Sequence, residues 1–288
     1  MAHETPEVPP PVTPPRRGTR LTRRGRLTLL IGAVLVLGVA AAVLVPLLTG
    51  EPNREDAART LVIPEGWRAT QVYAAVDKAL GEPDGTTAKA APTADLPLPA
   101  GAKGNPEGYL YPATYPVTSA TTPKSLLHYM TDTAVERFGA DHITAGSRRN
   151  DVTVYQTVTV ASIVQAEADT EADMGKVARV IHNRLDRGMP LQMDSTLNYA
   201  MNRSTLDTST GDTKLDSPYN SYARKGLPPT PIGNPGEQAM TAAIDPTPGP
   251  WLYFVTVAPG DTRFTDDYAE QQRNVAEFNR NRRGTGEG

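Results

Sequence analysis

A glutamate at the end of an apolar helix is the residue best placed in this sequence to do chemistry. A helix is predicted over residues 152–168, and at about 100° per residue Val160, Ile163, Val164 and Glu167 share one narrow sector of it. An acid at this position loses solvation and lies near the partially negative end of the helix, and both effects raise its pKa. A carboxyl group that stays protonated can serve as a general acid.

A structural explanation competes with this interpretation. A glutamate near a helix end is more often a solvated surface residue or the partner of an arginine. Glu171 is the nearest rival, but residues 170–173 predict a helix start in which Thr170 is the N-cap and Glu171 lies in the first turn. Negative charge is favourable there, so Glu171 has a structural explanation. Glu167 has none, and we prefer it as the candidate acid.

Two segments predicted to be irregular carry polar groups that a substrate would need. Residues 191–196 bring together an amide, a carboxylate and two hydroxyls, and residues 217–236 are dense in Pro and Gly, which stiffen a loop. A plain connector is the simpler interpretation of the second segment taken alone. Its length and rigidity favour a binding wall instead.

Composition excludes several classes of function. The chain has 288 residues, a hydrophobic fraction of 39% and a net charge of −3, which fit one or two globular domains. It contains no cysteine, so disulfides, thiolate ligands and a cysteine nucleophile are excluded. Positive charge is concentrated near the two ends, which does not favour nucleic-acid binding. His128, His142 and His182 lack ligand spacing, and we expect no metal and no cofactor.

The N-terminal region predicts a membrane anchor. An arginine-rich stretch precedes an uncharged run over residues 27–45, which is long enough to span a bilayer. We expect a transmembrane helix over 27–48, with a disordered, Pro/Arg-rich tail over 1–26 in the cytoplasm and the rest of the chain outside. The alternative is a cleaved signal peptide, which the absence of a clear small-x-small cleavage site disfavours.

The remaining pattern predicts an α+β protein with a small module and a helix-rich domain that contains a short sheet. Residues 49–105 predict a polar spacer, a strand, a helix and a Pro/Gly-rich linker, and the main domain is expected over 106–283, before a disordered tail at 284–288. In the small module we expect a strand at 61–63 and a helix at 69–80. In the main domain we expect helices at 123–138, 152–168, 171–187, 237–244 and 267–280 and a buried strand at 251–255.

A series of short motifs, in this order, resembles the membrane-bound endolytic murein transglycosylases of the MltG (YceG-like) type. The resemblance covers nearly all of the chain beyond the predicted membrane helix. The motifs lie at residues 63–66, 107–112, 161–167, 182–185, 188–192, 217–220, 226–229, 234–236 and 252–255.

The resemblance implies a bitopic inner-membrane enzyme in which a LysM-like module precedes a catalytic domain that cuts nascent glycan strands internally. The family's catalytic acid corresponds to Glu167, because Gln165 stands where many members have another Glu. The chain departs from the family pattern elsewhere. Ser195 stands where Pro is common, Gln271 where a His is expected, and the segment before Glu107 is short.

Lytic cleavage of the MurNAc–GlcNAc bond needs only one acid, because the sugar's own C6 hydroxyl displaces the leaving group and gives a 1,6-anhydro-MurNAc end. Peptidoglycan glycan strands are then the substrate, with peptidoglycan synthases or division proteins as possible partners. Two alternatives stay open: a muramidase in which Asp194 assists water, and a non-catalytic, anchored peptidoglycan-binding scaffold. The side chains assigned to glycan positioning are those of Gln192, Asp194, Thr196, Tyr219 and Asn220.

Overall fold

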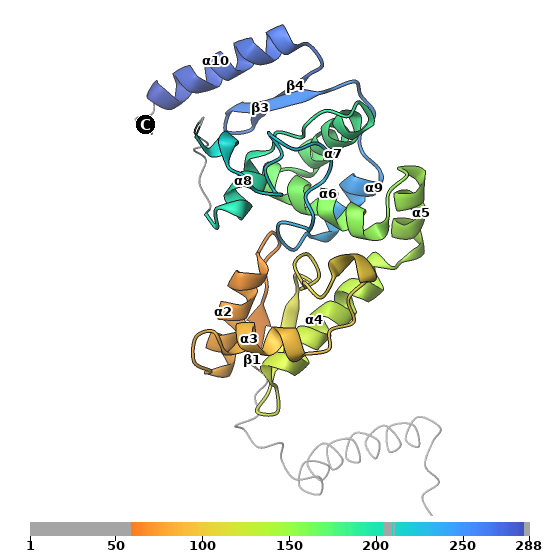
Figure 1. The fold of residues 1–288 in the computed structure, drawn as a ribbon, viewed down its shortest axis with the longest axis vertical. Helices are drawn as coiled ribbons and strands as arrows, with labels where there is room; N and C mark the ends of the chain where they lie inside the picture. Colours follow the sequence, from red (N-terminus) through yellow and green to blue (C-terminus); the bar gives the residue numbers. More distant parts are fainter. Residues whose placement is uncertain (1–58, 204–208, 210, 285–288) are drawn as a thin grey trace, which may run out of the picture. The chain divides into compact units, whose positions relative to one another are not determined.

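The protein is helix-rich and its strands form two small sheets (Figure 1). The structure, a computed structural model, describes residues 59–203, 209 and 211–284. All of these lie in one compact unit that starts at Ala58. The predicted α+β class is confirmed, with two two-stranded sheets where one short sheet was expected.

The helices and strands follow one another in two groups. The first group comprises β1 (Arg59–Val62), α2 (Ala69–Leu80), α3 (Thr86–Ala90), the 3-10 turns η2 (Ala91–Thr93) and η3 (Ala100–Ala102), β2 (Thr114–Val117) and α4 (Pro123–Phe138). The second comprises α5 (Asp141–Arg149), α6 (Val154–Glu167), α7 (Glu171–Asp186), α8 (Asp194–Ala200), η4 (Asp212–Lys214), α9 (Glu237–Ile244), β3 (Tyr253–Ala258), β4 (Asp261–Thr265) and α10 (Tyr268–Gly284).

The predicted anchor lies outside the part of the chain that the structure describes. This holds for the tail at 1–26, the transmembrane helix at 27–48 and, apart from the end of α10, the tail at 284–288. Among the described residues, no helix combines the length and the apolar character that a membrane span requires.

The first hydrophobic cluster forms around the β1–β2 pair. The two strands are antiparallel, with Leu61 opposite Tyr115, and α2 and α4 pack against them through side chains such as Val72 and Met130. β2 was not predicted, because it is only four residues long and contains a proline. The cluster takes residues from both sides of the boundary predicted between 105 and 106, which itself stays a prediction.

Residues 81–105, expected to be a linker or an irregular excursion, include a short helix and two 3-10 turns. A buried carboxylate anchors them, since Asp77 of α2 accepts hydrogen bonds from the Thr87 N–H and hydroxyl and from the Gly85 N–H. Burial would raise the pKa of Asp77, but these hydrogen bonds lower it below its ordinary value. Asp77 is therefore a structural charge.

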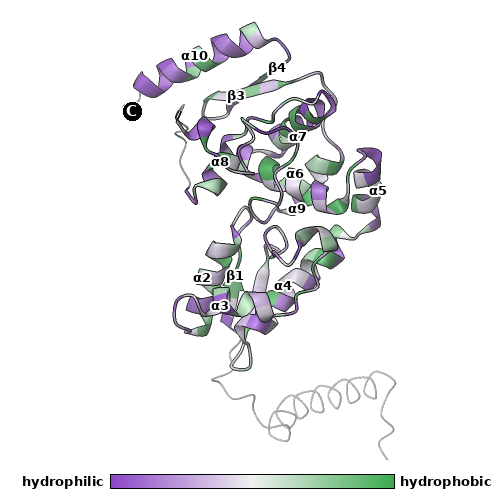
Figure 2. Ribbon diagram, viewed as in Figure 1, coloured by the Kyte–Doolittle hydropathy of each residue, from purple (hydrophilic) through white to green (hydrophobic). Residues whose placement is uncertain are grey.

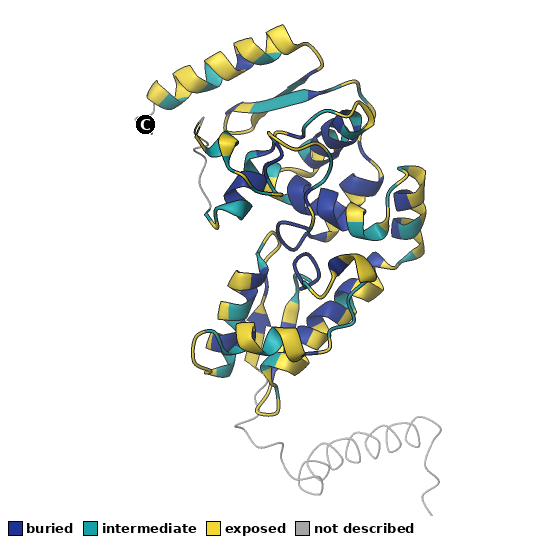
Figure 3. Ribbon diagram, in the orientation of Figure 1, coloured by how far each residue is buried: buried dark blue, intermediate teal, exposed yellow. Residues whose placement is uncertain are grey.

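The second hydrophobic cluster has α6 at its centre, packed against α7 and α9 (Figure 3). A capping box starts α6, in which the Gln156 N–H donates to Thr153 Oγ1 and the Thr153 N–H donates to Gln156 Oε1. Every residue from 157 to 164 is buried. The predicted sector of Val160, Ile163 and Val164 is buried as expected, and neighbouring elements cover the other sides of α6 as well.

The C-terminal part forms a hairpin and a polar helix. β3 pairs with β4, which was not predicted, and the turn between them contains Gly260 at φ +78°. β3 is half-buried rather than a buried strand. α10 is largely hydrophilic (Figure 2) and packs on β3, where Gln271 Nε2 donates to the Phe254 carbonyl oxygen at 3.0 Å.

Three of the short sequence motifs meet where the two hydrophobic clusters adjoin, since the Gly66 N–H of the first also donates to the Asn234 carbonyl oxygen at 2.7 Å. The Asn234 side chain accepts a hydrogen bond from the Leu110 N–H at 2.8 Å and donates one to the Trp67 carbonyl oxygen at 2.7 Å. Gly108 has φ +85°, and a Cβ there would lie 2.5 Å from Pro231. These motifs therefore join segments that are far apart in the sequence.

Candidate active site

Glu167 is the last residue of α6 and faces the start of α8. Both donors of Ser195 reach the same carboxyl oxygen, since the N–H lies 3.1 Å and the hydroxyl 2.6 Å from Glu167 Oε1. Among the described residues, no hydrogen bond reaches Oε2. One oxygen is thus fixed by the protein and the other is open to a partner.

The surroundings of Glu167 favour its neutral form. Glu167 keeps part of its surface accessible, yet protein atoms surround its carboxyl closely, and this burial raises the pKa. The two Ser195 hydrogen bonds lower the pKa and the negative charge of Asp194 raises it, and the net result is an increase. The direction predicted from the sequence is confirmed.

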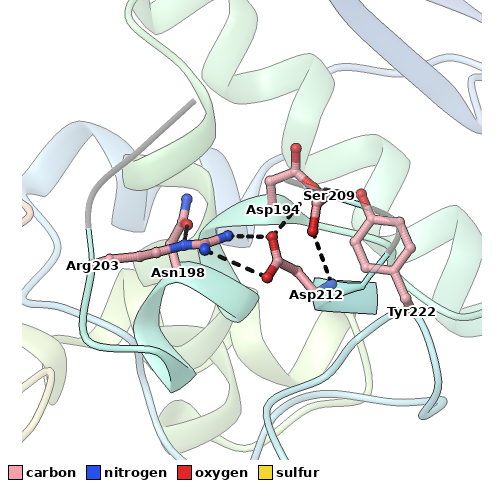
Figure 4. Close-up of polar contacts among 6 residues, drawn as sticks. All are labelled: Asp194, Asn198, Arg203, Ser209, Asp212 and Tyr222. Carbon is pink, nitrogen blue, oxygen red and sulfur yellow. Dashed lines mark hydrogen bonds and ion pairs between the residues drawn. The ribbon is translucent and has the colours of Figure 1, made fainter. Parts of the chain in front are cut away.

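Asp194 lies beside Glu167 and has a partner that was not predicted. The Tyr222 hydroxyl donates to Asp194 Oδ1 at 2.5 Å (Figure 4). Burial raises the pKa of Tyr222, and the hydrogen bond to Asp194 and the charges of Asp194 and Glu167 add to this increase. Tyr222 therefore stays a neutral donor, which orients Asp194 toward one side of the site.

Residues 194–196 lie on a helix, and the prediction that they belong to an irregular segment was wrong. Asp194 occupies the first turn of α8, where its charge interacts favourably with the helix dipole. Thr196 is fully buried; its hydroxyl donates to the Met193 carbonyl oxygen and lies 2.8 Å from Ser221 Oγ. The contacts of Thr196 join the start of α8 to the loop that carries Tyr222.

Asn220 is also fully buried, and its amide fixes the loop around it. Its Nδ2 donates to the carbonyl oxygens of Thr213 and Leu215, and its Oδ1 accepts from the N–H groups of Tyr222 and Ala223. These contacts lie within the protein, as do those of Thr196. Their predicted contact with a glycan stays a prediction.

Tyr219 and Gln192 lie nearer the surface. The Tyr219 hydroxyl is 2.9 Å from Thr230 Oγ1, and its ring centre is 4.9 Å from that of Tyr199. Gln192 is exposed at φ +55°, and its Oε1 accepts from Arg184 Nη1 at 3.0 Å. These two side chains are better placed than those of Thr196 and Asn220 to meet an external ligand.

Arg184 is a buried cation that positions the Gln192 segment. Its Nη1 donates to the Leu191 carbonyl oxygen at 2.7 Å, and its Nε to the Leu252 carbonyl oxygen at 2.6 Å. Its guanidinium lies 5.1 Å from the centre of the Tyr253 ring, and burial lowers its pKa. Arg184 therefore joins the segment after α7 to the strand β3.

Arg203, shortly after α8, forms an ion pair with Asp212. Arg203 Nη2 lies 2.6 Å from Asp212 Oδ2, and Arg203 Nε donates to Asn198 Oδ1 at 3.1 Å (Figure 4). Ser209 bonds to Asp212 as well, through its N–H and its hydroxyl. These contacts join Asp212 of η4 and Ser209 through Arg203 to Asn198 of α8.

Within the described residues, no group of histidines and carboxylates is arranged to bind a metal ion. His182 lies 3.0 Å from the Ala243 carbonyl oxygen through its Nε2, and burial lowers its pKa. It is a packing residue.

The helix-rich α+β frame carries a buried carboxyl group, that of Glu167, at the end of α6, with Asp194 beside it. A model of the YceG-like family matches residues 38–277, so the chain belongs to the YceG-like family. A putative YceG-like protein from Listeria monocytogenes, solved as a crystal structure, has a TM-score of 0.65 and 29% identity over 75% of each chain.

Curated relatives carry the name endolytic murein transglycosylase. The Bacillus subtilis protein is 36% identical over 171 residues, which are 58% of this chain and 46% of that protein. The protein of Streptococcus pneumoniae D39 is 34% identical over 256 residues, which are 80% of this chain and 46% of that protein. The chain thus spans about half the length of these relatives.

Proposed function

We propose that this protein is an endolytic lytic transglycosylase that cleaves the MurNAc–GlcNAc bond of nascent peptidoglycan and leaves 1,6-anhydro-MurNAc ends. The carboxyl of Glu167 carries the proposal. Burial raises its pKa and so favours the neutral acid, and its Oε2 has no hydrogen-bond partner among the described residues. Membership of the YceG-like family and the names of the curated relatives support the same activity.

Glu167 performs both proton transfers of the proposed reaction. As the bond between C1 of MurNAc and the glycosidic oxygen breaks, the neutral acid gives its proton to that oxygen. The C6 oxygen of the same MurNAc then bonds to C1, and its proton passes to the Glu167 carboxylate. Glu167 is protonated again, the strand is cut, and no water is consumed.

The contacts of Ser195 assign the two oxygens of Glu167 to different tasks. Oε1 accepts two hydrogen bonds, so the proton of the neutral acid lies on Oε2. Proton transfer to and from the sugar therefore uses Oε2. The two bonds to Oε1 also stabilise the carboxylate that forms when the proton leaves.

Asp194 stabilises the positive charge that develops at C1 in this mechanism. A muramidase would use the same carboxylate to activate water. Its Oδ1 already accepts the Tyr222 hydroxyl, which removes one of the two oxygens that could bind that water. This contact favours an electrostatic role and the lytic product.

The place of the reaction follows from the N-terminal sequence. Residues 27–48 anchor the chain in the cell membrane, residues 1–26 lie in the cytoplasm, and the catalytic domain lies outside. The LysM-like module within residues 49–105 contacts glycan strands, and cleavage of nascent strands beside peptidoglycan synthases or division proteins limits their length.

Mass spectrometry of glycan strands digested by the full-length protein in detergent tests the proposal. Anhydro ends and reducing ends differ by one water. Anhydro ends are the expected product; reducing ends point to the muramidase, and intact strands to the non-catalytic scaffold.

A further inference from the structure

Glu107 is a second buried acid, and the proposed chemistry does not use it. Only 4% of its surface is exposed. Its two carboxyl oxygens contact different helices: the Ala69 N–H at the start of α2 donates to Oε1 at 3.0 Å, and the Tyr199 hydroxyl of α8 donates to Oε2 at 3.0 Å. Glu107 therefore connects the first hydrophobic cluster to the helix that faces Glu167.

Arg68 strengthens the same connection. Its guanidinium carbon lies 5.3 Å from the centre of the Tyr199 ring, and its Nη2 donates to the Arg203 carbonyl oxygen at 2.8 Å. Tyr199 is in the last turn of α8, and Arg203 follows the helix. Glu107 and Arg68 thus both contact the C-terminal end of α8.

The other end of α8 contacts the catalytic acid. Ser195 donates twice to Glu167, and Asp194 accepts from Tyr222. With seven residues, α8 is about 10 Å long at roughly 1.5 Å per residue. A helix this short moves as a rigid unit, so a shift at Tyr199 is transmitted to Ser195.

We propose that Glu107 is a positioning residue which, together with Arg68, fixes α8 and thereby sets the hydrogen bonds of Ser195 to Glu167. Its effect on the reaction rate rests on the proposed function. Its effect on the titration of Glu167 does not, because that titration can be measured without turnover.

The charge state of Glu107 is poised to change near neutral pH. Burial raises its pKa to about 7, against the lowering effect of the hydrogen bonds from Ala69 and Tyr199 and of the charge of Arg68. The titratable and charged groups that face it are Arg68, Tyr73 and Tyr199, and burial together with Glu107 raises the pKa of Tyr73 to about 12. As the pH falls below about 7, protonation replaces a charged acceptor for Tyr199 with a weaker neutral one.

The test is the Tyr199→Phe variant, which removes the hydroxyl that donates to Glu107 and keeps the ring. The groups that face Glu167 are Asp194 and Tyr222, and neither is changed. The carboxyl signal of Glu167 is followed by ¹³C NMR against pH in the full-length protein, assigned by its loss in Glu167→Gln. We expect a higher pKa for Glu167, because looser Ser195 hydrogen bonds stabilise the carboxylate less.

Three comparisons make this result specific. Tyr129→Phe, at an exposed tyrosine outside the network, is the matched control and should leave the titration unchanged. Combining Tyr199→Phe with Ser195→Ala should shift it by less than the sum of the two single shifts, because both act on the same hydrogen bonds. Glu107→Gln keeps an acceptor for Ala69 but offers Tyr199 only a neutral partner, and should shift the Glu167 titration in the same direction as Tyr199→Phe by a smaller amount.

Two outcomes overturn the proposal: an unchanged Glu167 titration in Tyr199→Phe, or fully additive shifts in the double variant.

In the rate of strand cleavage, Tyr199→Phe should lower kcat roughly tenfold while KM stays nearly constant, since a misplaced catalytic group affects the transition state most. If the parent protein releases no anhydro ends but Tyr199→Phe shifts the Glu167 titration, the proposed function is contradicted and the positioning role stands. The reverse pattern contradicts the positioning role alone.

Discussion

Removal of the Ser195 hydroxyl should move the pH dependence of strand cleavage to higher pH. In the proposed mechanism Glu167 acts first as an acid and must be protonated, so activity should fall as the pH rises through its pKa. The hydroxyl donates to Oε1 at 2.6 Å and favours the carboxylate. In Ser195→Ala the pKa of Glu167 is therefore higher, and the variant stays active at a pH where the parent has lost activity.

The size of the shift follows from the loss of one charge-assisted hydrogen bond. Such a bond contributes about 1.5–3 kcal/mol to an ionised group and about 0.5–1.5 kcal/mol to a neutral one. The difference between the two forms is about 1–1.5 kcal/mol, and one pKa unit corresponds to about 1.4 kcal/mol. The alkaline limb should thus move up by about one pH unit, and the remaining N–H bond keeps the shift from being larger.

The assay is the initial rate of release of anhydro-ended fragments from purified sacculi, measured across pH for each variant. Ser195→Thr keeps a hydroxyl and should stay near the parent. Ser147→Ala is the matched control, because it removes another buried hydroxyl, which donates to the Ile143 carbonyl oxygen away from Glu167. An alkaline limb that is unmoved or lower in Ser195→Ala refutes the reasoning about the charge state of Glu167.

Asp194→Asn removes the negative charge that raises the pKa of Glu167, so the alkaline limb should move to lower pH, opposite to Ser195→Ala; the same pH–rate assay checks this, and a shift upward contradicts it. Gly108→Ala should lower the free energy of unfolding by about 2–4 kcal/mol in urea titrations, since it adds a clash to backbone strain. Gly104→Ala, at φ +82° with open space around it, should lose only about 1–2 kcal/mol. Equal losses would contradict this reasoning. Asp77→Asn should flatten the acid side of the stability profile, because the lowered pKa of Asp77 gives stability that is lost as the pH falls; Tm measured against pH checks it, and an unchanged slope speaks against it.

The position of Glu167 at the end of a buried helix could be predicted because its signal is local. An apolar run and a terminal Glu lie together within the 14 residues of α6, which spans Val154–Glu167 where a helix over 152–168 was expected. The burial of α6 on all its sides could not be predicted, because it depends on α7 and α9, which pack against α6 from other parts of the chain. The long helices were predicted correctly as helices, because their apolar residues recur at helical spacing.

The hydrogen bonds of Ser195, Tyr222 and Glu107 were not predicted, because they join distant residues. Ser195 and Glu167 are 28 positions apart, and Glu107 and Tyr199 are 92 apart. α8 has too few turns to show helical periodicity, although its acidic first residue is a usual start signal. One signal for these contacts was present in the sequence. Ser195 stands where Pro is common in the family it resembles, and a serine there has an N–H and a hydroxyl to donate where a proline has neither.

Substitution of Glu167 by glutamine, compared with the same change at Glu171, tests the central claim most directly. The two glutamates lie four positions apart, but Glu171 is in the first turn of α7 and outside the hydrogen-bonded site. The measurement is the yield of 1,6-anhydro-MurNAc ends from purified sacculi. Glu167→Gln should lower it by about 100- to 10,000-fold and Glu171→Gln should leave it near the parent value. A Glu167→Gln protein that releases anhydro ends at the parent rate contradicts the account.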